Sequence, residues 1–270
     1  MNGFDVVIFG GQSNMQGQSE ALLSREPVPS AFEYKLLSDE IVPLRDPAGE
    51  DIRRDGTAGY PFREGTEQSA WLADHAAGSA CYGHTSLIPA FCARCAALTG
   101  RRVLAVPCAK GSTGIADWLP GTDGWRILAG KTAGALRRVR KTSAAASVSL
   151  VWLQGESDAI AGRSKAYYKE KLRSLADALA RDAGVERVGI IRVGHFTHDA
   201  RDGEIIEAQR ELCREDARFW LLTELADMLE ASPGYMNPHV EGHFGARGLT
   251  LLGKAAGEAL ARVLPGRETV

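Results

Sequence analysis

Apolar runs and amphipathic segments alternate along this chain. Runs rich in β-branched residues predict buried strands, and they cover Asp5–Phe9, Arg102–Pro107, Ser147–Leu153, Arg187–Val193 and Phe219–Thr223. Between them, apolar side chains recur at helical spacing, as at Tyr168, Leu172, Leu175, Ala176 and Leu179. The last such segment, around Leu249–Val263, stops before Gly266. This alternation predicts an α/β protein, a three-layer α/β/α sandwich with a five-stranded, mostly parallel sheet.

One region interrupts the alternation. Residues 43–82 are polar, contain several glycines and show no clear periodicity. A loop of this length in a compact domain is usually functional or disordered, so we expect one domain over residues 1–270 with a loop excursion at about 43–82 that covers the site. Arg53, Arg54 and Trp71 within it could stack on or hydrogen-bond a sugar, although surface or core packing is the commoner role.

Composition narrows the classes of function. The 270 residues are 44% hydrophobic and 24% charged, with a net charge of -2, which gives no reason to expect nucleic acid or an anionic membrane as a partner. No apolar stretch has the length of a membrane span, and the first residues lack a signal-peptide pattern. We therefore expect a cytoplasmic protein. Cys92 and Cys95 form a C-x-x-C in a helical segment, but no second ligand pair is evident, which favours buried thiols over zinc.

Candidate chemistry begins where the first predicted strand ends. Gly10 and Gly11 follow the apolar run, and Ser13 comes where the backbone must turn. If a helix follows, Ser13 lies near its N-terminus, where free N–H groups can bind an anionic oxygen. That position suits a nucleophilic serine, but most such residues are N-caps or turn formers. The hypothesis therefore needs partners elsewhere in the chain.

Two further segments that follow strands offer such partners. The glycine-bearing turn Lys110–Gly114 could point backbone N–H groups at Ser13 as an oxyanion hole, and an ordinary strand-to-helix turn is the alternative. A Walker phosphate loop is disfavoured because the lysine precedes the glycines. Gln154 could donate an amide hydrogen to the same oxyanion. Glu156 could orient a histidine, bind a sugar hydroxyl or cap the next helix, and for Asp158 a capping or structural role is favoured.

Histidines precede the last predicted helix. His243 could reach across the strand ends to Ser13. His239 and His243 are four residues apart, which also suggests a metal site, but Pro238 and Gly242 argue against the helix that such a site requires. His195 and His198 could add ligands, yet a base is favoured over a metal site.

Taken together, these segments resemble the carbohydrate-esterase branch of the SGNH hydrolases, which includes acetylxylan-esterase-like proteins and the sialate O-acetylesterase domain. The matching segments follow the family's order and are Gly11–Met15, Lys110–Thr113, Trp152–Asp158, Glu207–Gln209 and His243–Phe244. The resemblance implies the flavodoxin-like SGNH fold and a serine esterase that hydrolyses small O-acyl esters, most often O-acetyl, of a carbohydrate. It also implies an acyl-enzyme intermediate and no metal or organic cofactor.

The resemblance assigns roles position by position. Ser13 would be the nucleophile and His243 the general base, and the oxyanion donors would come from the Ser13 amide, the Gly111–Ser112 turn and the Gln154 side chain. Further candidates for substrate binding are Gln12, Asn14, Trp118 and Glu241.

Two positions depart from the family pattern. Ser112 replaces a glycine, and Val240 stands where the family commonly has the acid of the triad. Glu156 is the favoured substitute for that acid, Glu241 is the other carboxylate on offer, and a dyad helped only by a backbone carbonyl is a third possibility.

Other functions stay open at this stage. The missing acid motivates a weakly active or inactive carbohydrate-binding relative, and the wider group suggests a GDSL-type lipid esterase, which would prefer long acyl chains. The expected partner is a small-molecule or oligosaccharide ester; xylan, a sialic acid and a small acetylated sugar all fit. The sequence carries no signal for the oligomeric state.

Overall fold

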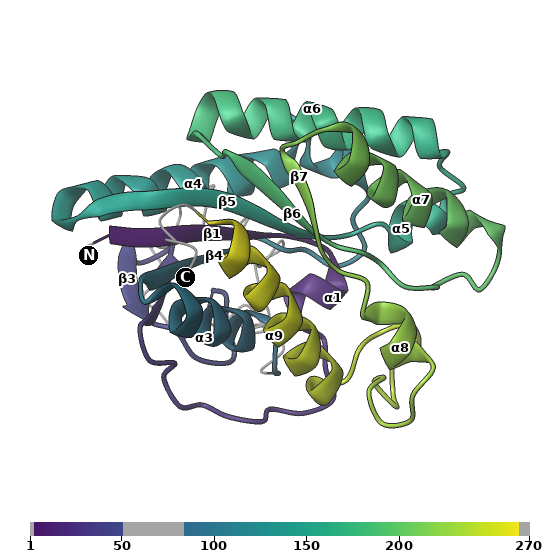
Figure 1. The fold of residues 1–270 in the computed structure, drawn as a ribbon, viewed down its shortest axis with the longest axis horizontal. Helices are drawn as coiled ribbons and strands as arrows, with labels where there is room; N and C mark the ends of the chain where they lie inside the picture. Colours follow the sequence, from purple (N-terminus) through teal and green to yellow (C-terminus); the bar gives the residue numbers. More distant parts are fainter. Residues whose placement is uncertain (1–2, 51–83, 265–270) are drawn as a thin grey trace, which may run out of the picture.

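A central sheet organises the computed structural model, which describes residues 3–50 and 84–264. Within these residues seven strands pair in the order β3-β2-β4-β1-β5-β6-β7 (Figure 1). Their bounds are β1 (Gly3–Gly11), β2 (Ala31–Lys35), β3 (Glu40–Pro43), β4 (Arg102–Pro107), β5 (Ala144–Leu153), β6 (Arg187–Ile191) and β7 (Phe219–Thr223). All neighbours pair in parallel except β2 and β3. The predicted α/β class with a mostly parallel sheet is confirmed.

The prediction of five strands is wrong by two. The five apolar runs form β1, β4, β5, β6 and β7, and the sheet gains β2 and β3 at one edge. β2 was missed because two of its five residues, Glu33 and Lys35, are charged yet buried. Their side chains form an ion pair with 3.0 Å between Nζ and Oε1. A charged residue on the inner side of a strand removes the apolar alternation by which a strand is recognised.

Helices cover both faces of the sheet (Figure 1). α4 (Asp123–Thr142), α6 (Lys165–Ala183) and α7 (Ala200–Glu215) lie on one face, and α3 (Ile88–Thr99) and α9 (Ala246–Val263) lie on the other. The short helices are α1 (Ser13–Gln16), α5 (Glu156–Ile160) and α8 (Ala226–Glu230). None of the helices in the described part of the chain combines the length and apolarity that crossing a membrane requires.

The C-x-x-C lies on α3. Cys92 and Cys95 are buried free thiols there, and the helix ends at Gly100 in the left-handed conformation. Burial raises the pKa of Cys95 to about 12, so this thiol is protonated at neutral pH and unreactive. The interpretation as small buried hydrophobic residues is confirmed by this burial.

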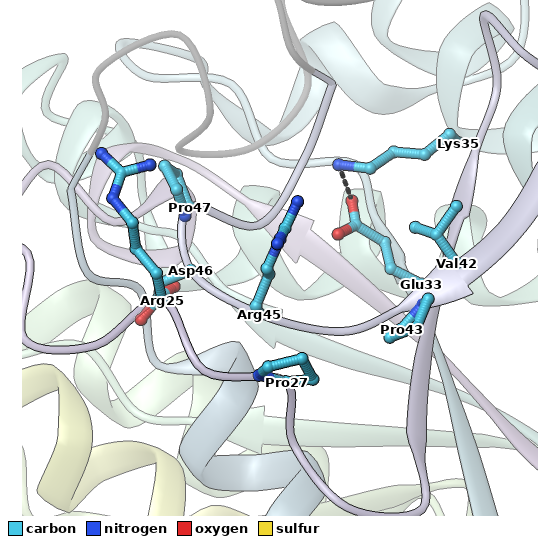
Figure 2. A pocket seen from close by; sticks show the side chains of 9 residues that line it. All are labelled: Arg25, Pro27, Glu33, Lys35, Val42, Pro43, Arg45, Asp46 and Pro47. Carbon is cyan, nitrogen blue, oxygen red and sulfur yellow. Dashed lines mark ion pairs between the residues drawn. The ribbon is translucent and has the colours of Figure 1, made fainter.

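A pocket of about 440 Å³ lies beside β2 and β3 at one edge of the sheet. Figure 2 shows Lys35 and Glu33 on one side and Arg25 with Asp46 on the other, with Arg45 between them. Most of the expected 43–82 excursion, with Arg53, Arg54 and Trp71, falls outside the described residues.

Candidate active site

The turn after β1 presents Ser13 at the carboxyl edge of the sheet. Gly11 has φ 141°, and a Cβ there would lie 2.0 Å from the carbonyl oxygen of Leu153, so only glycine fits. This close approach lets the Gln12 amide donate to the same oxygen at 3.1 Å. Ser13 then begins helix α1 and is 6% exposed. Ser13 therefore follows the central strand directly, held between the Gly11–Gln12 turn, which packs on Leu153, and helix α1.

His243 meets this serine from the loop before α9. Its Nε2 lies 2.8 Å from Ser13 Oγ, and its Nδ1 lies 2.8 Å from the backbone carbonyl oxygen of Glu241. A carbonyl oxygen can only accept, so Nδ1 carries the proton and Nε2 is left to accept from the serine. This is the tautomer that a general base needs.

The predicted acids lie in different places around the histidine. Val240 is 43% exposed, and Glu241 contributes its carbonyl oxygen. Glu156 is buried, and its Oε1 accepts a hydrogen bond from Asn14 Nδ2 at 2.9 Å. Burial raises the pKa of Glu156, while the bond from Asn14 and the nearby His243 oppose that rise. The atom facing Nδ1 is thus the Glu241 carbonyl, and the Glu156 carboxylate contacts Asn14 instead.

The glycine-rich turn after β4 lies beside the serine. A Cβ on Gly111 would come within 3.5 Å of Ser13 Cβ. The Gly111 amide is already used, because it donates to Gln16 Oε1 at 3.0 Å. Ser112, the next residue, adopts a left-handed φ of 61° and is exposed. The Gly111 and Ser112 amides were both predicted as oxyanion donors, and Gln16 engages only the Gly111 amide.

Gln154 is wholly buried behind the serine turn. Its Nε2 lies 3.2 Å from Gln12 Oε1, 3.0 Å from the Thr113 carbonyl oxygen and 2.6 Å from Asp158 Oδ2. An amide nitrogen has two hydrogens, so these three acceptors already engage both. Gln154 and Gln12 therefore join the turns after β1, β4 and β5, and the amide hydrogens expected for an oxyanion are occupied.

A pocket of about 390 Å³ opens next to Gly111. Polar side chains line it, with Lys110 and Ser112 on the turn after β4 and Asp123 at the start of α4. Trp118 also reaches this wall, but it is wholly buried and its ring packs edge-to-face on Trp152 at 5.9 Å between centroids. The pocket therefore offers hydrogen-bonding groups more than an exposed aromatic surface.

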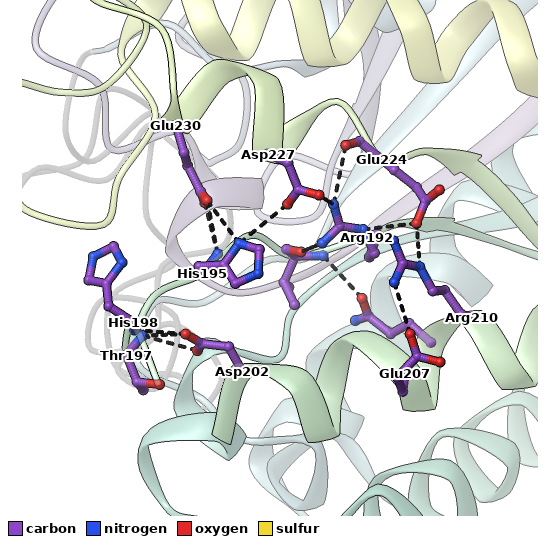
Figure 3. A network of polar contacts seen from close by, with 12 residues as sticks. Arg192, His195, Thr197, His198, Asp202, Glu207, Arg210, Glu224, Asp227 and Glu230 are labelled. Atoms are coloured by element: carbon purple, nitrogen blue, oxygen red, sulfur yellow. Dashed lines mark hydrogen bonds and ion pairs between the residues drawn. The ribbon is translucent and has the colours of Figure 1, made fainter. Parts of the chain in front are cut away.

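The loop after β6 supports His243, a role that the sequence did not indicate, since it offered only His195 and His198 there as possible metal ligands. The Phe196 ring packs edge-to-face on the His243 imidazole with 6.2 Å between ring centroids, and a Cβ on Gly242 would collide with the Phe196 ring. Glu230 of α8 holds this loop by accepting the His195 amide at 3.0 Å (Figure 3). The available signal was position, because this loop follows β6 at the same edge of the sheet as Ser13.

This loop and helix α8 together carry a candidate metal-ligand group. Among the described residues, His195, Asp227 and Glu230 could offer one ligand atom each, all within 4.8 Å of one another. However, the guanidinium of buried Arg192 lies 2.6 Å from Asp227 Oδ2 (Figure 3). This fixed cation already compensates the carboxylate, and it would repel a metal ion in the same place.

A mostly parallel sheet that carries a Ser–His pair at its carboxyl edge is the architecture expected of the SGNH hydrolases, and the chain has this architecture. Within that class the chain belongs to the family "carbohydrate esterase, sialic acid-specific acetylesterase", whose model matches residues 3–262. The comparison with curated proteins finds no match.

Solved structures share the fold at low sequence identity. A protein from Arabidopsis thaliana is 17% identical with a TM-score of 0.65, over 96% of this chain and 98% of that one. NanS is 13% identical with a TM-score of 0.64, over 96% and 97% of the two chains. A carbohydrate acetylesterase from Xanthomonas citri is 15% identical with a TM-score of 0.57, and the match covers 98% of this chain and 58% of that one.

Proposed function

We propose that the protein is a serine esterase that hydrolyses small O-acyl esters, above all O-acetyl esters, of a carbohydrate. The observation that carries this proposal is the 2.8 Å contact between Ser13 Oγ and His243 Nε2. Membership of a carbohydrate-esterase family supports the class of substrate.

The reaction proceeds in two acyl-transfer steps. His243 Nε2 takes the proton of Ser13 Oγ as that oxygen bonds to the ester carbonyl carbon. The tetrahedral intermediate then expels the sugar oxygen, which leaves as an alcohol with the proton returned by His243. Water attacks the acyl-enzyme with the same base, and the acid and free Ser13 result. The carbonyl oxygen of Glu241 holds the Nδ1 proton throughout.

Two backbone amides stabilise the oxyanion in this proposal. Ser13 supplies the first amide, at the N-terminus of α1, and Ser112 supplies the second. The Gly111 amide is engaged by Gln16, and the amide hydrogens of Gln154 are engaged by its neighbours. Removing one such donor from an esterase costs about 10²–10³ in kcat.

The test is hydrolysis of p-nitrophenyl acetate by the wild-type protein, Ser13→Ala and His243→Ala. We expect both variants to lose several orders of magnitude in kcat, and the wild-type rate to be unchanged by a metal chelator. His239→Ala is the matched control, because His239 is an exposed histidine of the same loop, and it should retain the wild-type rate. A wild-type rate equal to that of Ser13→Ala would refute the proposal.

The substrate is tested separately. Acetate esters should be hydrolysed faster than octanoate esters, and the reverse order would indicate a lipid esterase. We propose that the sugar occupies the pocket beside Gly111, where Lys110 can donate a hydrogen bond. Lys110→Met should therefore raise KM for an acetylated sugar without changing the rate on p-nitrophenyl acetate, which carries no sugar. Equal effects on both substrates would contradict the proposal that the sugar binds in this pocket.

A further inference from the structure

We propose that Glu156 is a positioning residue that acts through Asn14, and that the two side chains clamp the loop carrying His243. This inference rests on the proposed esterase function, because it concerns how the base is held against the nucleophile. It assigns Glu156 a different task from that of a triad acid, which would contact the imidazole directly.

The contacts of Asn14 carry the inference. Its Nδ2 donates to Glu156 Oε1 at 2.9 Å and to the Gly242 carbonyl oxygen at 3.2 Å. Its Oδ1 accepts from the Phe244 amide at 3.0 Å. Gly242 and Phe244 are the two residues that flank His243, so one side chain grips the backbone on both sides of the base.

The position of Asn14 gives this grip its purpose. Asn14 follows Ser13 directly in α1, so the nucleophile and the clamp move as one rigid turn. Loss of these bonds therefore lets the loop shift relative to the turn, which changes the distance between Ser13 Oγ and His243 Nε2. A misplacement of about 1 Å can cost about 100-fold in rate.

Glu156 and the backbone groups of the His243 loop together determine which way the Asn14 amide points. A carboxylate oxygen only accepts, so it selects the orientation in which Nδ2 faces Glu156. In that orientation Oδ1 faces the Phe244 amide and Nδ2 faces the Gly242 carbonyl; the flipped amide would set oxygen against oxygen at both Glu156 and Gly242. Asn14 and Glu156 are each 3% exposed, so bulk water is kept from these bonds.

Conservative and truncating variants separate the clamp from a direct acid. Glu156→Gln keeps an acceptor for Asn14 Nδ2 and removes the charge, whereas Glu156→Ala removes both. We expect Glu156→Gln to retain kcat on p-nitrophenyl acetate within about tenfold of wild type, and Glu156→Ala and Asn14→Ala each to lose about 100-fold with KM unchanged. Because both act through one contact, the double variant Asn14→Ala/Glu156→Ala should be no slower than either single variant.

The control is Asp5→Asn, which alters a buried carboxylate at the other end of β1, paired with Arg101 and Ser147. Its kcat per folded molecule should stay at the wild-type value even if its melting temperature falls. Thermal unfolding of every variant shows whether it is folded, and if Glu156→Ala is not, Glu156→Gln and Asn14→Ala still decide the question.

The opposite pattern would overturn the clamp. If Glu156→Gln were as slow as Glu156→Ala while Asn14→Ala stayed near wild type, Glu156 would act through its charge on the imidazole. Additive losses in the double variant would likewise contradict a shared contact. Failure of the esterase proposal looks different, because wild type would then be no faster than Ser13→Ala.

Discussion

Placing an aspartate at position 240 should accelerate the proposed reaction. The His243 amide lies 3.4 Å from the Val240 carbonyl oxygen, so the two residues stand at the ends of one turn. The Cα atoms at the ends of such a turn lie within about 7 Å, and a short side chain can reach the ring. Val240 is 43% exposed, so a carboxylate there keeps much of its hydration.

The size of the gain follows from the bond that Nδ1 already makes. The Glu241 carbonyl oxygen accepts from it at 2.8 Å, a neutral hydrogen bond worth about 1 kcal/mol net. A charge-assisted bond is about twice as strong, so a carboxylate in its place would stabilise the imidazolium of the transition state by about 1 kcal/mol more. That corresponds to a gain of about fivefold in kcat. Solvent screening at an exposed site sets this as the upper end of the range.

The assay is kcat for p-nitrophenyl acetate in Val240→Asp, with Val240→Asn as the matched control. Asparagine has the same shape but no charge, so it should give no gain. A rate for Val240→Asp at or below that of Val240→Asn, in two folded proteins, would refute the reasoning, because it would mean that charge at Nδ1 does not limit this base.

Three further predictions concern stability and loop position. Gly11→Ala should lower the free energy of unfolding by about 3 kcal/mol or more in urea titrations, because its Cβ would overlap the Leu153 carbonyl at a φ of 141°; an unchanged midpoint would contradict the close approach. Burial raises the pKa of Asp46 from 3.8 to about 7, so the folded state binds this proton more tightly than the unfolded state. The stability of the folded state therefore falls as pH rises from about 4 to 7, by at most about 4 kcal/mol. Asp46→Asn should therefore lose less stability between pH 5 and pH 8 than wild type, as measured by urea midpoints. An equal loss in both proteins would mean that Asp46 does not cause this pH dependence. Glu230→Ala frees the loop that carries Phe196, and it should lower kcat about tenfold with KM unchanged, whereas full activity would mean that the loop needs no such anchor.

The strands that the sequence predicted are those with a continuous run of mostly apolar side chains. β4 and β7 begin and end at the predicted residues, because apolar side chains fill both strands. β2 escaped prediction because Glu33 and Lys35 are buried in it as an ion pair. A second buried ion pair joins Lys131 of α4 to Glu50, with 2.7 Å between Nζ and Oε1. A buried charge is tolerated only with its partner in place. Glu50 and Lys131 lie far apart along the chain, so no local pattern could show that they meet.

For the site, the sequence predicted which segments meet but not how their amides point. Ser13 was expected at the edge of the sheet where strand ends gather, and His243 was expected to reach it from the segment before the last helix. The structure brings their atoms to 2.8 Å. Gln154 and Asn14 were both predicted near the serine. Their donors face other protein groups, which depends on rotamers that only packing fixes. Their roles, like those of Ser13 and His243, stay predictions for the assays above.

The modest gain expected at position 240 also explains how such a site can lack the usual acid. In a triad, replacing the aspartate by asparagine costs about 10⁴ in kcat, because the imidazole adopts the wrong tautomer. Here Nδ1 faces the Glu241 carbonyl, an acceptor that cannot donate, so the tautomer is already fixed without a carboxylate. What the site lacks is the charge beside Nδ1, since in the clamp that we propose Asn14 and Glu156 hold the position of the ring. In this proposal, valine at position 240 removes one of the three tasks of a triad acid, and the Glu241 carbonyl oxygen and the Asn14–Glu156 pair perform the other two.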